Sequence, residues 1–289
     1  MSTDNILDKV KKLRELTGVG FKDCKNAIDE NNGDIEKSIE FLRKKGIAKA
    51  NKKMERVAAE GLVCISEKEN KFSIIEINSE SDFVAKNNEF INFVEEISKL
   101  ALRHSGKKKD ILVTEMQNKK NVETNLITLI SKIGEKITFR RSDFFGEDKL
   151  LNFSYMHAAL KKNVGKIGVL VSLKTKKPKK ELLEFGKQLS MHIAALSPLA
   201  IDKDDLDKNL LKKEKEIITE ELKNSGKDSK IVDKIAAGKL NKFIAENTLL
   251  NQEWIMEPKK KVRDILKEIS RKDKIEIKKF VRFKVGEGI

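Results

Sequence analysis

The stretch GLVCISEKENKFSIIEINSESDFVAKNNEF, Gly61 to Phe90, contains the change of pattern that decides the fold. Two runs rich in β-branched residues, 61–66 and 72–78, flank the polar segment 67–71 and predict a β-hairpin. An amphipathic helix follows, with apolar side chains at helical spacing from Phe90 to Leu100. A hairpin that leads into a helix with one apolar face predicts an α+β fold.

The same unit recurs further along the chain. EFINFVEEIS, residues 89–98, aligns without a gap with ELLEFGKQLS, residues 181–190, and each copy follows a hairpin-like stretch. The second copy is preceded by KIGVLVSLK, residues 166–174, a strand rich in β-branched residues. Two such units indicate a duplicated α+β core. We expect its other elements to be strands at 136–141, 150–160 and 275–289 and helices at 122–133, 180–196 and 260–269.

Residues before the hairpin predict three short helices. Apolar residues recur at helical spacing from Ile6 to Leu16, from Phe21 to Asp29, and after the N-capping Asp34, with Gly46 as the stop signal. A basic linker, 48–56, would join this bundle to the core. A bundle this small offers few pockets, so it suits docking better than catalysis.

A helical hairpin interrupts the second unit. The pattern predicts one helix over 206–222, a turn at Asn224-Ser225-Gly226 and a second helix that closes at Gly238. The expected organisation is a bundle at 1–47, a linker at 48–56, core subdomain N at 57–145, core subdomain C at 146–203 and 239–275, the inserted coiled-coil hairpin at 204–238 and a C-terminal segment at 276–289.

Composition narrows the classes of function. The 289 residues carry a formal net charge of +15, which suits an acidic partner or nucleic acid. Lys dominates over Arg, however, and Asn and Ile are abundant, which favours the bias of an A+T-rich genome. A ribosome- or RNA-binding protein is an alternative, although 6% aromatic residues supply few stacking platforms.

The expected location of the protein in the cell follows from two targeting features that the sequence lacks. It contains no apolar run of membrane-spanning length and no secretory signal pattern, so we expect no membrane association. Cys24 and Cys64 show no pairing pattern and are expected to be reduced thiols in a cytoplasmic protein.

No pattern in the sequence predicts bond chemistry. Phosphate-binding and dinucleotide-binding glycine loops are absent, as are metal-binding His and Cys spacings, so we expect no catalytic residue, metal or cofactor. His157 and His192 stand in apolar contexts, where a packed, hydrogen-bonded histidine is the more frequent case. An enzyme assembled from dispersed residues stays open as an alternative.

The corner between the hairpin and its helix, Ser81-Asp82-Phe83-Val84, has two interpretations. Ser81 or Asp82 could cap a helical turn while Phe83 anchors the helix to the sheet. Alternatively, an exposed aromatic at a rigid corner could enter a crevice of a partner protein, with the neighbouring carboxylate acting on a charged or metal-bearing site there.

Several blocks resemble one family. LRELTGVGFKDCKNAIDENNGDIEKSIEFLRKKG, residues 13–46, is similar to the N-terminal signature of the bacterial elongation factor Ts family. INSESDFVAKN, residues 77–87, resembles its second signature, and MHIAA and RFKVGEGI, residues 191–195 and 282–289, resemble later blocks. The blocks keep the family's order and span essentially the whole chain.

The resemblance implies a function. The family's factor is the guanine-nucleotide exchange factor of elongation factor Tu, the partner we therefore expect; it needs no cofactor, and we do not expect nucleic acid. The bundle is similar to ubiquitin-associated domains and docks on the GTPase. The hairpin corresponds to a coiled-coil or dimerisation region, which leaves open a homodimer or a two-plus-two complex.

The resemblance also assigns roles to residues. The block at the corner is tied to displacement of the partner's magnesium ion, and the family's usual Thr is replaced here by Ser81, which keeps the hydroxyl. Phe21 stands where Met is common. The candidate residues are Ser81, Asp82, Phe83 and Val84 at the corner, Leu13, Val19, Gly20 and Phe21 in the docking bundle, and His157 and His192 as further interface residues.

Overall fold

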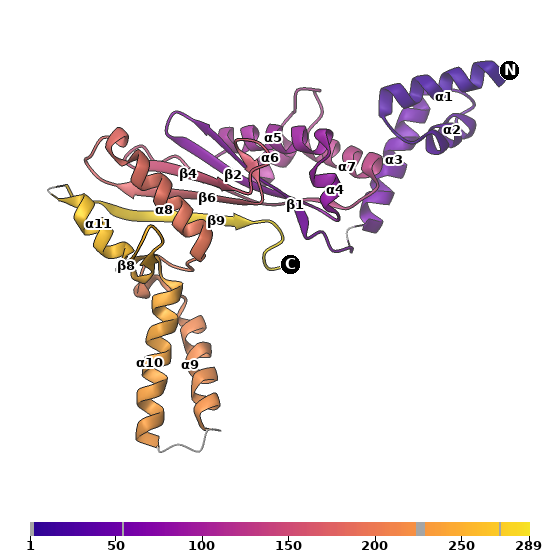
Figure 1. Ribbon diagram of the computed structural model, residues 1–289. Helices are drawn as coiled ribbons and strands as arrows, with labels where there is room; N and C mark the ends of the chain where they lie inside the picture. Colours follow the sequence, from indigo (N-terminus) through magenta and orange to yellow (C-terminus); the bar gives the residue numbers. More distant parts are fainter. Residues whose placement is uncertain (1–2, 54, 224–228, 272) are drawn as a thin grey trace.

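The computed structural model describes residues 3–53, 55–223, 229–271 and 273–289. Figure 1 shows a helical bundle at the N-terminus, a central body built on two sheets, and a long helical hairpin that projects from this body. The fold is α+β, as the sequence predicts, with a duplicated core and an inserted hairpin.

The N-terminal bundle consists of α1 (Thr3–Thr17), α2 (Phe21–Glu30) and α3 (Ile35–Lys53). Its core contains Val10, Leu13, Val19, Cys24, Ala27, Ile28 and Leu42. The expected stop at Gly46 is wrong, because α3 continues to Lys53 through most of the expected linker. A Cβ at Gly46 would lie only 3.3 Å from Oγ of Ser131. The missing side chain at Gly46 therefore allows α3 to approach the core closely.

The first core unit contains β1 (Glu60–Lys68), β2 (Lys71–Ser79) and β3 (Ile137–Phe145), which pair antiparallel in this order. The two-residue strand β5 (Val164–Gly165) adds to the free side of β1. Between β2 and β3 the chain forms α4 (Asp82–Ala85), α5 (Asn88–Arg103), α6 (Lys108–Val113) and α7 (Val122–Ile133). The hairpin at 61–78 and the helix at 122–133 are thus confirmed.

The second core unit repeats this order. Strands β4 (Leu151–His157), β6 (Ile167–Lys174) and β9 (Glu276–Lys284) pair antiparallel in chain order, as β1, β2 and β3 do. Helix α8 (Leu183–Leu196) follows the second strand as α5 does, and α11 (Val262–Ser270) precedes the third as α7 does. The predicted duplication is confirmed. The small hairpin of β7 (Glu253–Trp254) and β8 (Glu257–Lys261) has no counterpart.

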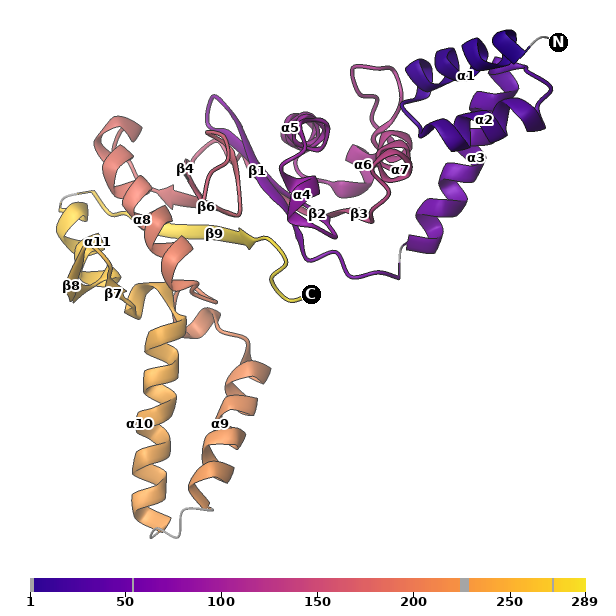
Figure 2. The ribbon, with the colours of Figure 1, turned by 45° about the vertical axis from the view of Figure 1, so that its right-hand side comes forward.

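The two sheets pack face to face, and helices cover their outer faces (Figures 1 and 2). On β1, Val63 and Ile65 face the second sheet and join a cluster with Leu170 and Phe283, whereas Leu62 and Cys64 face α5. This alternation is the two-residue period of a strand buried on both sides. Gly168 allows the close approach, because a Cβ there would lie 2.7 Å from Val63 and 2.9 Å from Ile74.

The helical hairpin consists of α9 (Lys208–Lys223) and α10 (Ser229–Asn247). The second helix was expected to end at Gly238, but it continues to Asn247, because an isolated glycine weakens a helix without ending it. The expected turn at 224–226 lies outside the described residues. The two ends of the insertion are joined by backbone hydrogen bonds, from Leu199 N to Asn247 O and from Leu249 N to Ala200 O, both 2.9 Å long.

Candidate functional site

The corner between β2 and α5, residues 80–87, holds the most exposed large apolar side chain of the described residues. Phe83 is 79% exposed. Val84 and Ala85, on the same turn, are buried in the core cluster under α5. Of the two interpretations of the corner, the one in which Phe83 anchors the helix to the sheet is therefore wrong, because the single turn of α4 directs Val84 inward and Phe83 into solvent.

Hydrogen bonds hold this corner rigidly. Glu135 accepts from Ser81 twice, from the backbone N at 2.9 Å and from Oγ at 2.7 Å. Ser79 Oγ donates to Ser81 O, and Glu80 accepts from Lys136 N and from Arg56. Ser81 makes no side-chain cap of α4, so the capping interpretation is wrong for this residue. Its hydroxyl instead joins the corner to the segment between α7 and β3.

Asp82 is a surface carboxylate. Lys86 Nζ donates to its Oδ2 at 2.7 Å, and this hydrogen bond lowers the pKa of Asp82 below its ordinary value. The carboxylate is therefore ionised at neutral pH, directly beside the exposed ring. Together, Asp82 and Phe83 place an ionised carboxylate, paired with Lys86, and one aromatic face on a braced turn.

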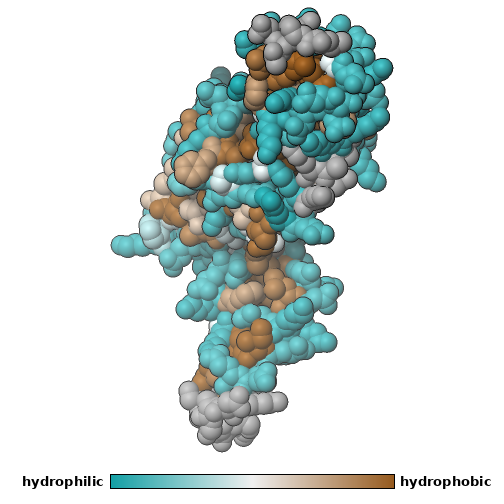
Figure 3. Space-filling model, turned by 90° about the vertical axis from the view of Figure 1, so that its right-hand side faces the viewer, coloured by the Kyte–Doolittle hydropathy of each residue, from teal (hydrophilic) through white to brown (hydrophobic). Residues whose placement is uncertain are grey.

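The docking residues predicted in the bundle differ in exposure. Gly20 and Phe21 are exposed, Phe21 to 44%, whereas Leu13 is fully buried and Val19 is 7% exposed. Leu13 therefore cannot contact a partner directly; it fills the core of the bundle. Leu16, which the sequence reading did not select, is 60% exposed. Figure 3 shows a mostly hydrophilic face with a separate apolar patch on the bundle and others along the hairpin.

His192 is a packed histidine, the case that the sequence favoured over a ligand or base. Its side chain is fully buried, stacks on Trp254 with ring centroids 5.2 Å apart, and bonds Gln252 Oε1 at 3.0 Å. Burial lowers its pKa to about 4. His192 does not lie on the surface, so the structure gives it no direct place in an interface.

His157 lies at the end of β4 and is exposed, so for this residue the packed interpretation is wrong. Its Nδ1 is 3.2 Å from the hydroxyl of Tyr155. Both side chains line a surface depression of about 480 Å³, together with Met191 and Arg282 among others. The sequence context of His157 is apolar, but the strand ends there and the side chain reaches solvent.

The described residues contain no group of three or more His, Cys, Asp or Glu placed to hold a metal ion. Both cysteines are free and buried. None of the described helices is long and apolar enough to cross a membrane.

Residues 80–287 match the family model described as Elongation factor TS. Elongation factor Ts of Bartonella tribocorum is 40% identical over 284 residues, which are 97% of this chain and 92% of that one. The protein of the same name from Maricaulis maris is 39% identical over 286 residues, 97% and 91% of the two chains. That of Methylorubrum populi is 41% identical over 283 residues, 97% and 92%. The chain belongs to the elongation factor Ts family, whose members act in translation elongation.

Proposed function

We propose that the chain binds GDP-bound elongation factor Tu in the cytoplasm, displaces its magnesium ion and promotes release of GDP, so that GTP can rebind. The single observation that carries this proposal is Phe83, a ring 79% exposed on a turn that is held by the hydrogen bonds of Ser81 to Glu135 and by the burial of Val84. Burying such a ring in a partner's crevice supplies about 2 kcal/mol.

Exchange of this kind needs no bond chemistry. GDP is held by backbone amides at a helix N-terminus and by magnesium that bridges its phosphates. A protein that binds the nucleotide-free partner more tightly than the GDP-bound partner must weaken GDP binding by the same factor. The chain therefore acts as an exchange factor and not as an enzyme.

The corner residues have separate roles. Phe83 enters between side chains of the partner, and the ionised Asp82 fixes it there by hydrogen bonding. Ser81 holds the turn through Glu135, and Val84 anchors it in the core of the first unit. When the inserted ring displaces a helix of the partner, the partner's magnesium ligands move out of position.

Contacts outside the corner provide affinity for the partner. In the bundle, the exposed residues Leu16, Gly20 and Phe21 dock on the GTPase. In the second unit, His157 and its depression face the same partner. The hairpin, α9–α10, serves an interaction with another protein or with a second copy of the chain.

The test uses elongation factor Tu loaded with labelled GDP, with release followed against excess free GDP. We expect Phe83→Ala to lower the release rate at saturating chain at least tenfold, which corresponds to about 1.4 kcal/mol or more. Val113→Ala is the matched control, because Val113 is another apolar side chain, 67% exposed, on α6. Release at the parental rate by a folded, bound Phe83→Ala chain would contradict the insertion of Phe83 into the partner.

A further inference from the structure

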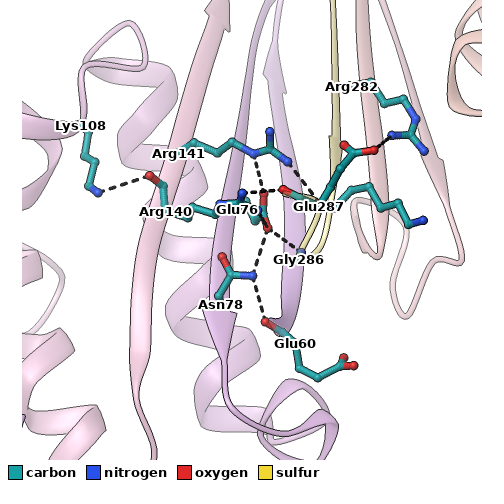
Figure 4. Close-up of polar contacts among 10 residues, drawn as sticks. Glu60, Glu76, Asn78, Lys108, Arg140, Arg141, Arg282, Gly286 and Glu287 are labelled. Carbon is teal, nitrogen blue, oxygen red and sulfur yellow. Dashed lines mark hydrogen bonds and ion pairs between the residues drawn. The ribbon is translucent and has the colours of Figure 1, made fainter. Parts of the chain in front are cut away.

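A buried carboxylate lies between the two core units. Glu76, on β2, has no exposed surface. Four groups donate to it, as Figure 4 shows: Asn78 Nδ2 at 3.0 Å, Arg140 Nη1 at 3.0 Å, Arg141 Nε at 2.6 Å and the backbone N of Gly286 at 3.0 Å. A buried charge requires this degree of compensation, and its loss would leave two guanidinium groups without their counter-charge.

A β-bulge brings both arginines to the same carboxylate. Consecutive residues of a strand normally point to opposite faces of a sheet. In the β2–β3 pair, however, Glu76 is opposite Arg141 and Ile77 is opposite Phe139, so Arg140 is the extra residue. A bulge of this kind redirects a side chain. Here it places two adjacent guanidinium groups within reach of Glu76.

The arginines also hold the C-terminal turn that follows β9. Arg140 Nη2 donates to Glu287 O at 2.5 Å, and Arg141 Nη2 donates to Lys284 O at 3.2 Å. The Arg141 guanidinium lies over the Phe283 ring, 4.2 Å from its centroid. The last residues of the second unit are thus fastened to β2 and β3 of the first unit.

Gly286 makes this contact sterically possible. Its φ is +74°, and a Cβ there would lie 2.2 Å from the carbonyl oxygen of Ala59. Gly288 has nearly the same φ, +78°, but the nearest atom to its Cβ would be Nη2 of Arg140 at 3.8 Å. The two glycines share the same backbone restriction, and only Gly286 has no room for a side chain.

We propose that the contact between Glu76 and the C-terminal turn at Gly286 positions the two core units for exchange. It fastens the C-terminal turn to β2, the strand that leads into the corner with Phe83, and so fixes the first unit relative to the second. This inference rests on the proposed function. A preordered pair of units meets the partner without the cost of ordering on binding.

The first measurement is structural and needs no partner. Spin labels on Glu123→Cys of α7 and Lys187→Cys of α8, both exposed positions, report the distance between the units. The native cysteines are buried. We expect Gly286→Ala to broaden the distance distribution and Gly288→Ala to leave it at the parental width. Equal widths in all three chains would overturn the inference.

The second measurement separates the positioning of the two units from the insertion of the Phe83 ring into the partner. In the GDP-release assay, we expect Gly286→Ala to raise the half-saturating concentration about fivefold and to leave the saturating rate unchanged, because the bound geometry is the same. Phe83→Ala should instead lower the saturating rate. A folded Gly286→Ala chain that matches Gly288→Ala, while the parental chain accelerates release, would overturn this inference alone. A parental chain that does not accelerate release would overturn the proposed function and this inference with it.

Discussion

Phe83 and Val84 are neighbours on one helical turn, yet one is 79% exposed and the other 6%. A side chain in water contributes little to the stability of its own fold. We therefore expect Phe83→Ala to change the free energy of unfolding by less than about 0.5 kcal/mol, whereas Val84→Ala should lower it by about 1–3 kcal/mol. Denaturant titration of both variants measures the difference. Equal losses would contradict the outward orientation of the ring.

Ser81 is the residue that braces this turn. Ser81→Ala removes the hydrogen bond from Oγ to the carboxylate of Glu135, which should lower the free energy of unfolding by about 1–2 kcal/mol. Ser81→Thr keeps the hydroxyl and is the matched control. Thermal unfolding of the two variants distinguishes them, and equal melting temperatures would show that the hydroxyl has no bracing role.

His192 predicts a dependence of stability on pH. Burial lowers its pKa from 6.5 to about 4. Between these values the unfolded chain binds a proton that the folded chain excludes, so the free energy of unfolding falls as the pH falls. From pH 7 to pH 5 we expect a loss of about 2 kcal/mol from this group. Urea titrations of the parental chain and of His192→Gln across this range measure it, and identical slopes would contradict the assignment.

The sequence predicts the corner between β2 and α5 but not the role of every residue near it. Apolar spacing places Leu13 on the buried face of its helix, whereas the family resemblance made it a docking candidate, and Leu13 lies in the core. Nothing in the spacing separates the exposed Phe83 from the buried Phe90. Glu76 was missed, although a single charge within the apolar strand 72–78 is a signal of a buried ion pair. Its partner Gly286 is remote in sequence, and the bulge at Arg140 appears only when strands pair.

At the scale of elements, the hydrophobic periodicity of the sequence predicts the positions and types of the long helices and strands. It does not predict where several of these elements end. Both α3 and α10 pass through a glycine that was expected to end them, at Gly46 and Gly238. The helix continues because packing on α7, and on α9 in the hairpin, offsets the weak propensity of glycine. Short elements such as α6 and the β7–β8 hairpin carry too few residues for a period to be recognised.

Substitution by alanine should change the free energy of unfolding in opposite directions at two glycines that lie within helices. A Cβ at Gly238 would meet no atom within 4 Å, so Gly238→Ala should raise the free energy of unfolding by about 0.5–1 kcal/mol. At Gly186 of α8, a Cβ would lie 2.2 Å from the ring of Phe153, so Gly186→Ala should lower it by about 1–3 kcal/mol. Denaturant midpoints measure both changes. A shift of the same sign would contradict this reading of the two helices.

For the whole molecule, the interface between the sheets decides whether the core units unfold together. Gly168→Ala places a methyl group between Val63 and Ile74, which should weaken this interface by about 1–3 kcal/mol. The single tryptophan, Trp254, is buried in the second unit and reports on that unit. We expect its fluorescence transition to coincide with that of a probe on α7 in the parental chain and to separate from it in the variant. Coincident transitions in both chains would contradict a dominant role of this interface.

The backbone hydrogen bonds that join Leu199 to Asn247 and Ala200 to Leu249 have a consequence for how this architecture can vary. The chain leaves the body and returns to it at adjacent points, so loop closure across the gap costs little whatever lies beyond. The arm can therefore be lengthened, trimmed or grafted from a relative without rebuilding the body that carries it. Size variation among related chains is best accommodated there.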